Sequence, residues 1–260
     1  MSPKSKKTAR HEQDEQIKKA MLGEHYPEDM HVYRLDRHNF TIYIGGDPQA
    51  ETEAGEEPGV EHKMADRFAI NLGILKGIDP ERPVLIELSS CGGNWTHGIK
   101  MFGHILAYPA PVTVLGTFDT RSMTSIIPLA ADRFLIQPPA QYMYHCGSYG
   151  FLGLEQEANT DDIERRKMIE TMFRIYVARL KSQGAYKGWE EQSIRDMLEE
   201  RMRKEIDVWL TADEAKRWGF ADDVFEGNWK TLRATKINIE RRKLMAAVLR
   251  KKVKVEIRVS

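Results

Sequence analysis

The sequence predicts an α/β fold, on the strength of three observations. Short apolar runs alternate with segments of helical spacing, which is typical of parallel strands joined by crossover helices. No period of about 20–50 residues repeats, which excludes solenoids and propellers. The composition over 260 residues is 41% hydrophobic and 30% charged, which fits a globular body with a buried core.

Turn residues delimit the first elements. Residues 1–30 are charged and nearly free of β-branched side chains, so we expect a loose or helical arm there. The apolar run 39–44 predicts a strand because it ends at Gly45-Gly46-Asp47-Pro48, and an acidic loop follows. Apolar positions at helical spacing predict helices at 63–76 and 95–107. Short apolar runs predict strands at 84–88 and 112–115.

The second half of the chain continues the alternation. Further strands are expected at 133–136, 141–145 and 208–210. Further helices are expected at 122–131, 161–181 and 190–203. Thr211 and Glu214 form a capping-box pattern, so a last helix should cover 212–218 and stop at Gly219.

A glycine turn and a serine point to chemistry. Strand 84–88 runs into Gly92-Gly93, and paired glycines leave backbone amides free to approach a ligand. Strand 112–115 leads to Ser122 at a predicted helix start, where amides are unpaired. The amides of Gly93 and Met123 could therefore form an oxyanion hole facing the Ser122 hydroxyl. An ordinary turn and an N-cap serine explain the same spacing, and spacing alone favours that simpler interpretation.

Four segments in a fixed order favour the catalytic interpretation of Ser122 over the ordinary N-cap serine. They are Ser90-Cys91-Gly92-Gly93, Gly116-Thr-Phe-Asp-Thr-Arg-Ser122-Met123, Met143-Tyr144-His145-Cys146 and Asp207-Val-Trp-Leu-Thr-Ala-Asp-Glu-Ala215. Together they resemble the motifs of the ClpP serine peptidases. The resemblance implies a ClpP/crotonase-like fold of repeated β-β-α units with a protruding helical handle.

The resemblance also assigns roles to five residues. It makes Ser122 the nucleophile, His145 the general base and Asp207 the acid that orients the histidine. It makes the amides of Gly93 and Met123 the oxyanion hole. A serine hydroxyl is a poor nucleophile near neutral pH, so it needs such a base.

Other acidic residues fit structural roles, and the sequence departs from the family pattern at several positions. Asp213 lies inside the capping box, and we interpret Asp222 and Asp223 as surface residues. Cys91 and Cys146 replace prolyl and glutaminyl positions of the family pattern, and we interpret both as packing residues. Arg121 precedes the nucleophile, where it is expected to narrow or charge the pocket. Pro128 should kink the helix that follows.

Several expectations concern domains, cofactors and partners. We divide the chain into an arm (1–30), a peptidase domain (31–228) and a basic tail (229–260). No cofactor or metal is expected, and no GxxxxGK[ST] motif exists for ATP hydrolysis. The resemblance implies a peptide or unfolded-protein substrate, a homo-oligomeric ring and a separate AAA+ ATPase partner. Two cysteines and the lack of a long apolar run favour a cytoplasmic protein without membrane contact.

Two other functions stay open at this point. A crotonase-type acyl-CoA enzyme resembles the same fold and also uses two backbone amides, but it needs no serine nucleophile. The order of Ser122, His145 and Asp207 disfavours it. The other is a catalytically inactive ring subunit. A phage protease that trims capsid scaffold proteins is a variant of the peptidase interpretation.

The zero net charge of the chain is a cancellation. Residues 230–260 hold 11 Lys/Arg and 2 Asp/Glu, a local charge of +9, so the remainder carries −9. A basic helix or strand that docks on an acidic neighbour and a solvated tail both fit this pattern. Nucleic acid is not the expected partner.

Overall fold

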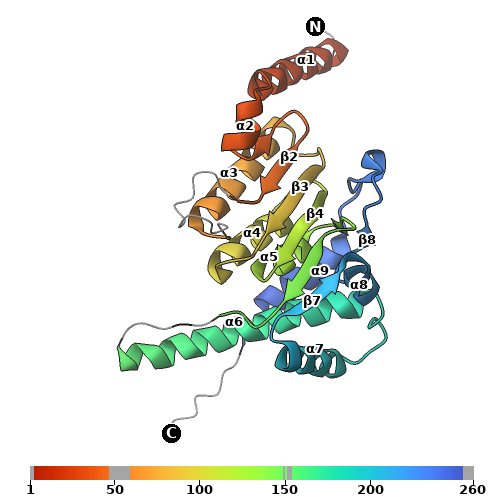
Figure 1. The fold of residues 1–260 in the computed structure, drawn as a ribbon. Helices are drawn as coiled ribbons and strands as arrows, with labels where there is room; N and C mark the ends of the chain where they lie inside the picture. Colours follow the sequence, from red (N-terminus) through yellow and green to blue (C-terminus); the bar gives the residue numbers. More distant parts are fainter. Residues whose placement is uncertain (1–2, 47–58, 149, 151–153, 254–260) are drawn as a thin grey trace.

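A computed structural model describes residues 3–46, 59–148, 150 and 154–253. Its centre is a mostly parallel sheet in the strand order β1-β2-β3-β4-β5-β8, with β6 and β7 branching from β4 (Figure 1). The strands are β1 Leu35–Asp36, β2 Thr41–Ile44, β3 Val84–Ser90, β4 Val112–Arg121, β5 Arg133–Ile136, β6 Gln141–Tyr144, β7 Val208–Thr211 and β8 Asp223–Val224.

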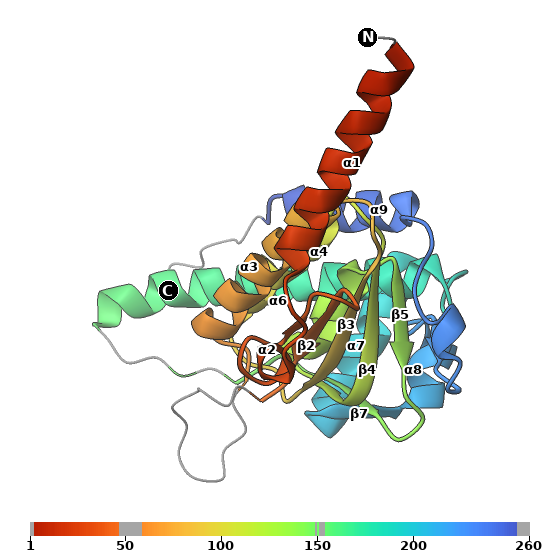
Figure 2. The same cartoon turned by 90° about the horizontal axis from the view of Figure 1, so that it is seen from above.

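Helices cover this sheet, and two of them extend beyond it. The helices are α1 Pro3–Leu22, α2 Pro27–Val32, α3 His62–Ile78, α4 Trp95–Ala107, α5 Met123–Ile126, α6 Glu155–Ser182, α7 Glu191–Glu205, α8 Ala212–Trp218 and α9 Ile239–Arg250. Helix α1 and the first turns of α6 project from the body in both views (Figures 1 and 2). The projecting part of α6 corresponds to the expected helical handle. The division of the chain into arm, domain and tail stays a prediction.

Strand β4 passes from one set of partners to another, and this positions the site. Its first half pairs with β3 and β5; in its second half Asp119–Arg121 pairs with β6, while Thr120 still pairs with Ser90 of β3. Strand β7 then pairs antiparallel with β6, so that Tyr144 lies opposite Val208. The end of β4, the end of β6 and the start of β7 therefore meet at one edge. Ser122, His145 and Asp207 are the residues immediately beyond those three points.

One predicted helix is wrong. Residues 122–131 were expected as a single helix, but α5 ends at Ile126 and a 3-10 helix covers Ile127–Ala130. Pro128 explains the change, because proline lacks an amide hydrogen and fits the first positions of a helical segment rather than its interior. By contrast, the helix at 212–218 is confirmed, with its Thr211–Glu214 capping box and with Gly219 in the left-handed conformation.

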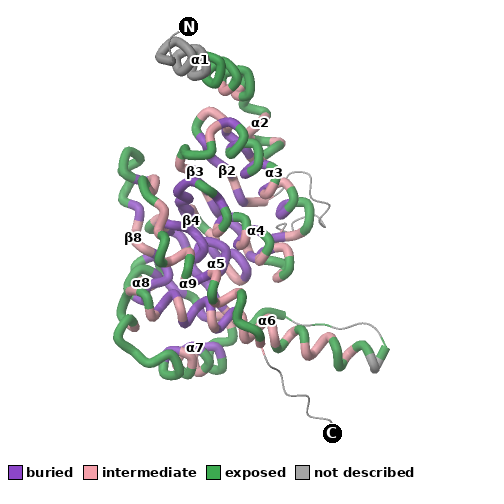
Figure 3. The backbone as a smooth tube through the Cα atoms, turned by 180° about the vertical axis from the view of Figure 1, so that it is seen from behind, coloured by how far each residue is buried: buried purple, intermediate pink, exposed green. Residues whose placement is uncertain are grey.

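The core lies between the sheet and the helices, and the central strands β3, β4 and β5 are buried along most of their length (Figure 3). An aromatic cluster joins β6 to α6 and α8. The ring of Tyr142 lies 4.7 Å from that of Phe220, and the ring of Tyr144 lies 5.8 Å from that of Tyr176. Burying several aromatic rings anchors the end of β6, next to His145.

The basic C-terminal segment docks on the body up to the end of α9. Met245 is fully buried, and Arg242 pairs with the buried Asp132. Arg241 donates to both carboxylate oxygens of Asp222, at 2.8 and 2.6 Å. The positive charge is therefore partly neutralised by acidic groups of the domain, and a fully solvated tail is wrong for these residues.

Asp222 is not a surface residue, contrary to the sequence-based interpretation. Its carboxylate also accepts hydrogen bonds from the fully buried Arg179 at 3.0 Å and from the Phe134 amide at 2.7 Å. Burial alone would raise the pKa of Asp222. The two guanidinium groups and the hydrogen bonds outweigh that effect and hold its pKa well below the usual range.

Asp222→Asn is expected to destabilise the fold by about 3 kcal/mol, because it leaves the Arg179 guanidinium buried without its counter-charge. The depressed pKa also means that the ionised Asp222 stabilises the fold above the ordinary aspartate pKa of about 4. This contribution is lost as the pH falls further. Thermal melts at fixed protein concentration, at pH 7 and pH 3.5, test both statements.

Asp223→Asn is the matched control, because Asp223 forms an exposed pair with Lys216. It should change stability by less than about 0.5 kcal/mol. If Asp222→Asn melted at the wild-type temperature at pH 7, the buried network of Asp222 with Arg179 and Arg241 would not stabilise the fold as described.

Candidate active site

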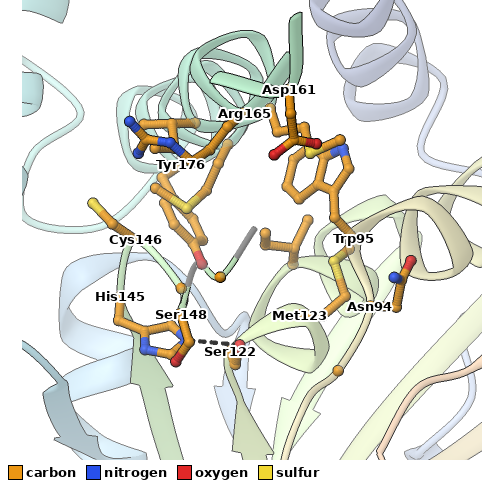
Figure 4. Close-up of a pocket in the computed structure, with 17 residues that line it drawn as sticks. Asn94, Trp95, Ser122, Met123, His145, Cys146, Ser148, Asp161, Arg165 and Tyr176 are labelled. Atoms are coloured by element: carbon orange, nitrogen blue, oxygen red, sulfur yellow. Dashed lines mark hydrogen bonds between the residues drawn. The ribbon is translucent and has the colours of Figure 1, made fainter. Parts of the chain in front are cut away.

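The structure brings Ser122, His145 and Asp207 into one hydrogen-bonded line. His145 Nε2 lies 2.7 Å from Ser122 Oγ, and His145 Nδ1 lies 2.8 Å from Asp207 Oδ1. Figure 4 shows the serine and the imidazole facing each other at the base of a pocket. With a proton on Nδ1, the imidazole donates to the carboxylate and its Nε2 can accept the serine proton.

Ser122 makes a sharp turn between β4 and α5. Its backbone has φ 52° and ψ −121°, a conformation that L-residues rarely adopt, and its amide donates to the Met143 carbonyl at 2.9 Å. The turn leaves the side chain free of the α5 cap, directed toward His145. Such strain costs about 1–3 kcal/mol and is typically found at functional sites.

The glycine turn lies directly against Ser122. A Cβ on Gly92 would meet Ser122 Cβ at 2.5 Å, and Gly92 has φ +106°. The next residue, Gly93, forms a parallel bridge with Val60, in which Val60 donates to Gly92 and Asn94 donates to Val60. The bridge therefore uses the Gly92 carbonyl and the Asn94 amide. The amide of Gly93 takes no part in it.

The two amides expected to form an oxyanion hole are open to a ligand. Met123 is the first residue of α5, where an amide has no partner within its own helix. Within the described residues, neither its amide nor that of Gly93 donates a hydrogen bond. Both residues line the pocket that contains Ser122 and His145. Their role as an oxyanion hole stays a proposal.

Asp207 differs from the buried carboxylate that the triad chemistry predicts. Its side chain is 45% exposed, whereas that of His145 is 19% exposed. Asp207 follows α7 after a single residue and precedes β7. Its position relative to His145 therefore depends on the backbone at the end of α7.

The pocket has a volume of about 540 Å³, and α6 forms a wall that the sequence analysis did not single out. Tyr176 ties this wall to the serine, since its hydroxyl lies 2.7 Å from Ser125 Oγ and Ser125 Oγ donates to the Ser122 carbonyl. Apolar spacing along the predicted helix could have identified the wall. Its residues are Met168, Ile169, Met172 and Tyr176, with Asp161 and Arg165 nearer the N-terminus of the helix.

The structure shows the surroundings of Arg121 and Cys146, two residues that depart from the family pattern. Arg121 does not line the pocket; it pairs with Asp119 at 2.7 Å and lies over the ring of Trp209. The expectation that it narrows the pocket is therefore wrong, and the expectation that it charges the pocket stays a prediction. Cys146 lines the pocket and is exposed as a residue, so the interpretation of it as a packing residue is wrong, although its sulfur lies 3.3 Å from Met202 Sδ. Partial desolvation of the sulfur and the nearby Glu199 raise the pKa of its thiol, which disfavours a thiolate nucleophile.

Among the residues that the structure describes, no group of three or more His, Cys, Asp or Glu side chains is arranged to hold a metal ion. In the same part of the chain, no helix has both the length and the apolar character needed to cross a bilayer.

Known proteins with similar sequences and structures identify the family. The Clp protease family model matches residues 56–228. The chain is 30% identical over 170 residues to ATP-dependent Clp protease proteolytic subunit 1 of Chlamydia abortus, covering 65% of this chain and 82% of that protein. It is 25% identical over 169 residues to the corresponding subunit of Deinococcus radiodurans, covering 64% and 76%.

A solved structure supports the fold. A ClpP1 mutant from Listeria monocytogenes superposes with a TM-score of 0.57 at 22% identity, covering 74% of this chain and 94% of that chain. At this identity the likeness shows the fold alone, and it confirms the predicted ClpP-like α/β architecture. Because the family model spans more than half of the sequence, the chain belongs to the Clp protease family.

Proposed function

We propose that this chain is a serine endopeptidase that cleaves peptide bonds through an acyl-enzyme. The observation that carries the proposal is the unbroken hydrogen-bond line from Ser122 Oγ through His145 to Asp207, at 2.7 and 2.8 Å. It lies at an open pocket large enough for a side chain of a peptide. Membership of the Clp protease family supports the same reaction.

The chemistry follows from the positions of these groups. Ser122 Oγ attacks the scissile carbonyl carbon while His145 Nε2 takes the hydroxyl proton. The resulting oxyanion accepts hydrogen bonds from the amides of Gly93 and Met123, each worth about 3 kcal/mol of barrier. The peptide C–N bond then breaks, and the imidazolium returns the proton to the leaving amine. Water repeats the sequence to release the acid.

The crotonase-type and inactive alternatives receive less support. A crotonase-type site has no need of a serine paired with a histidine, whereas this chain builds that pair with a strained serine backbone. An inactive subunit would need no open amides beside the serine.

A ring assembly and an ATPase partner form the second part of the proposal. The relatives bear the name of proteolytic subunits of ATP-dependent proteases, which supports a separate ATPase for this chain. We place the peptide or unfolded-protein substrate in the pocket between α4, α5 and α6.

Purified full-length protein tests the proposed function. With blocked peptides of varied sequence and no ATP, mass spectrometry should find products cut at internal peptide bonds. His145→Ala should lose this cleavage by at least a thousandfold, because the serine then has no base. Intact peptides after prolonged incubation with an assembled wild-type protein would contradict the proposal.

A further inference from the structure

The backbone at Ile206 is strained at a point next to the proposed catalytic acid. Ile206 has φ 63° and ψ −70°, and the Asp207 amide donates to the Glu205 carbonyl at 2.7 Å. A hydrogen bond between residues two apart, around a central residue of positive φ, defines a rare and strained γ-turn. A β-branched residue at positive φ is an outlier in folded proteins.

The Ile206 side chain does not compensate for this strain. It is 76% exposed, so it gains little from burial. The backbone around it is fixed on both sides. The Ile206 amide caps α7 through the Met202 carbonyl at 2.9 Å, and Val208 begins β7 opposite Tyr144. Only two residues therefore connect α7 to β7, and the γ-turn makes that connection possible.

The carboxylate of Asp207 has little else to orient it. Within the described chain its side chain makes one hydrogen bond, to His145 Nδ1, and it is 45% exposed. A carboxylate with a single partner can meet that partner in a staggered rotamer only if its Cα–Cβ bond already points toward it. The direction of the Cα–Cβ bond of Asp207 is set by the turn at Ile206.

We propose that the γ-turn at Ile206 is a positioning device that aims the Asp207 carboxylate at His145. The inference rests on the proposed function and deepens it, since Ile206 lies outside the hydrogen-bonded line from Ser122 through His145 to Asp207. It acts through its backbone conformation, and the exposed side chain is dispensable. Strained backbone that persists beside reacting groups is typical of pre-organised sites.

Three changes at the turn separate backbone from side chain. Ile206→Gly removes the side chain but adopts positive φ readily, so phosphonylation of Ser122 by a fluorophosphonate probe, with loss of fluoride, should stay within about threefold of the wild-type rate. Ile206→Pro cannot adopt positive φ and should slow this phosphonylation at least tenfold. Insertion of one glycine after Ile206 relaxes the turn while keeping every amide, and it should behave like Ile206→Pro.

A double-variant comparison shows whether the turn acts through the acid. Asp207→Asn removes the charge that orients and stabilises the imidazolium and is expected to slow phosphonylation by the probe by about ten-thousandfold. In that background, Ile206→Pro and the glycine insertion should slow phosphonylation by less than about twofold further. A purely structural defect would slow both backgrounds equally, which would overturn the proposal.

A proton resonance gives a readout that does not depend on turnover. A histidine Nδ1–H held by a carboxylate gives a far-downfield proton signal, which His145→Gln assigns by its loss. We expect the signal in wild type and in Ile206→Gly, and its loss in Ile206→Pro and in the insertion variant. Its loss in Ile206→Gly, or its persistence in the other two, overturns the role of the turn. If wild type shows the signal but never reacts with the probe, the proposed function fails while the positioning role is still decided by these spectra.

Discussion

Ser122→Ala is expected to lower the rate of peptide hydrolysis by about a millionfold, because no other group in the pocket replaces the attacking oxygen. The Ser122 side chain makes no capping hydrogen bond to α5, so removal of its hydroxyl should leave the fold intact. The rate is measured on a blocked peptide, and circular dichroism verifies the fold.

Ser148→Ala is the matched control for this prediction. Ser148 lines the same pocket and is exposed, but it lies outside the hydrogen-bonded line. It should keep hydrolysis within about threefold. If Ser122→Ala retained more than about a hundredth of wild-type activity, a different nucleophile would have to be sought.

Gly92→Ala is expected to cost at least a hundredfold in hydrolysis and to lower the melting temperature. An added Cβ would lie 2.5 Å from Ser122 Cβ and 2.8 Å from the Arg121 carbonyl, at a φ of +106°. Both neighbours belong to the turn that presents the nucleophile, so any shift that relieves the contact moves Ser122 away from His145. The left-handed conformation adds about 1–2 kcal/mol of strain for any L-residue.

Gly103→Ala is the control for this steric argument. Gly103 lies inside α4, and a Cβ there would meet nothing within 4 Å. Alanine favours helix over glycine by up to about 1 kcal/mol, so this variant should melt at the wild-type temperature or above it, with full activity. Wild-type hydrolysis by Gly92→Ala would show that the turn does not constrain the serine.

The sequence predicted best those helices whose ends are marked by capping residues, glycine or proline. Helix α4 begins and ends as expected, because Asn94 caps its first turn and a proline-containing segment follows it. Helix α8 has the Thr211–Glu214 box and a terminal glycine. The extension of β4 to Arg121 was missed, because its last residues pair with β6 and that pairing is set by tertiary structure.

The order of the motifs, rather than their chemistry alone, led to the candidate site. Ser122, His145 and Asp207 adjoin three neighbouring strand ends, and strand pairing is invisible to local pattern analysis. The same limit explains Asp222, which follows a helix end in sequence but meets Arg179 and Arg241 from distant elements. Isoleucine has no preference for positive φ, so nothing in the sequence pointed to the turn at Ile206.

The central claim is that Ser122 forms the covalent bond to the substrate carbonyl carbon, and labelling by a fluorophosphonate probe tests it most directly. The folded wild-type protein is treated with the probe, digested, and examined by mass spectrometry. We predict one adduct, on the peptide that contains Ser122, and its loss in His145→Ala. An assembled wild-type protein that carries no adduct, or carries it on another residue, would contradict the account.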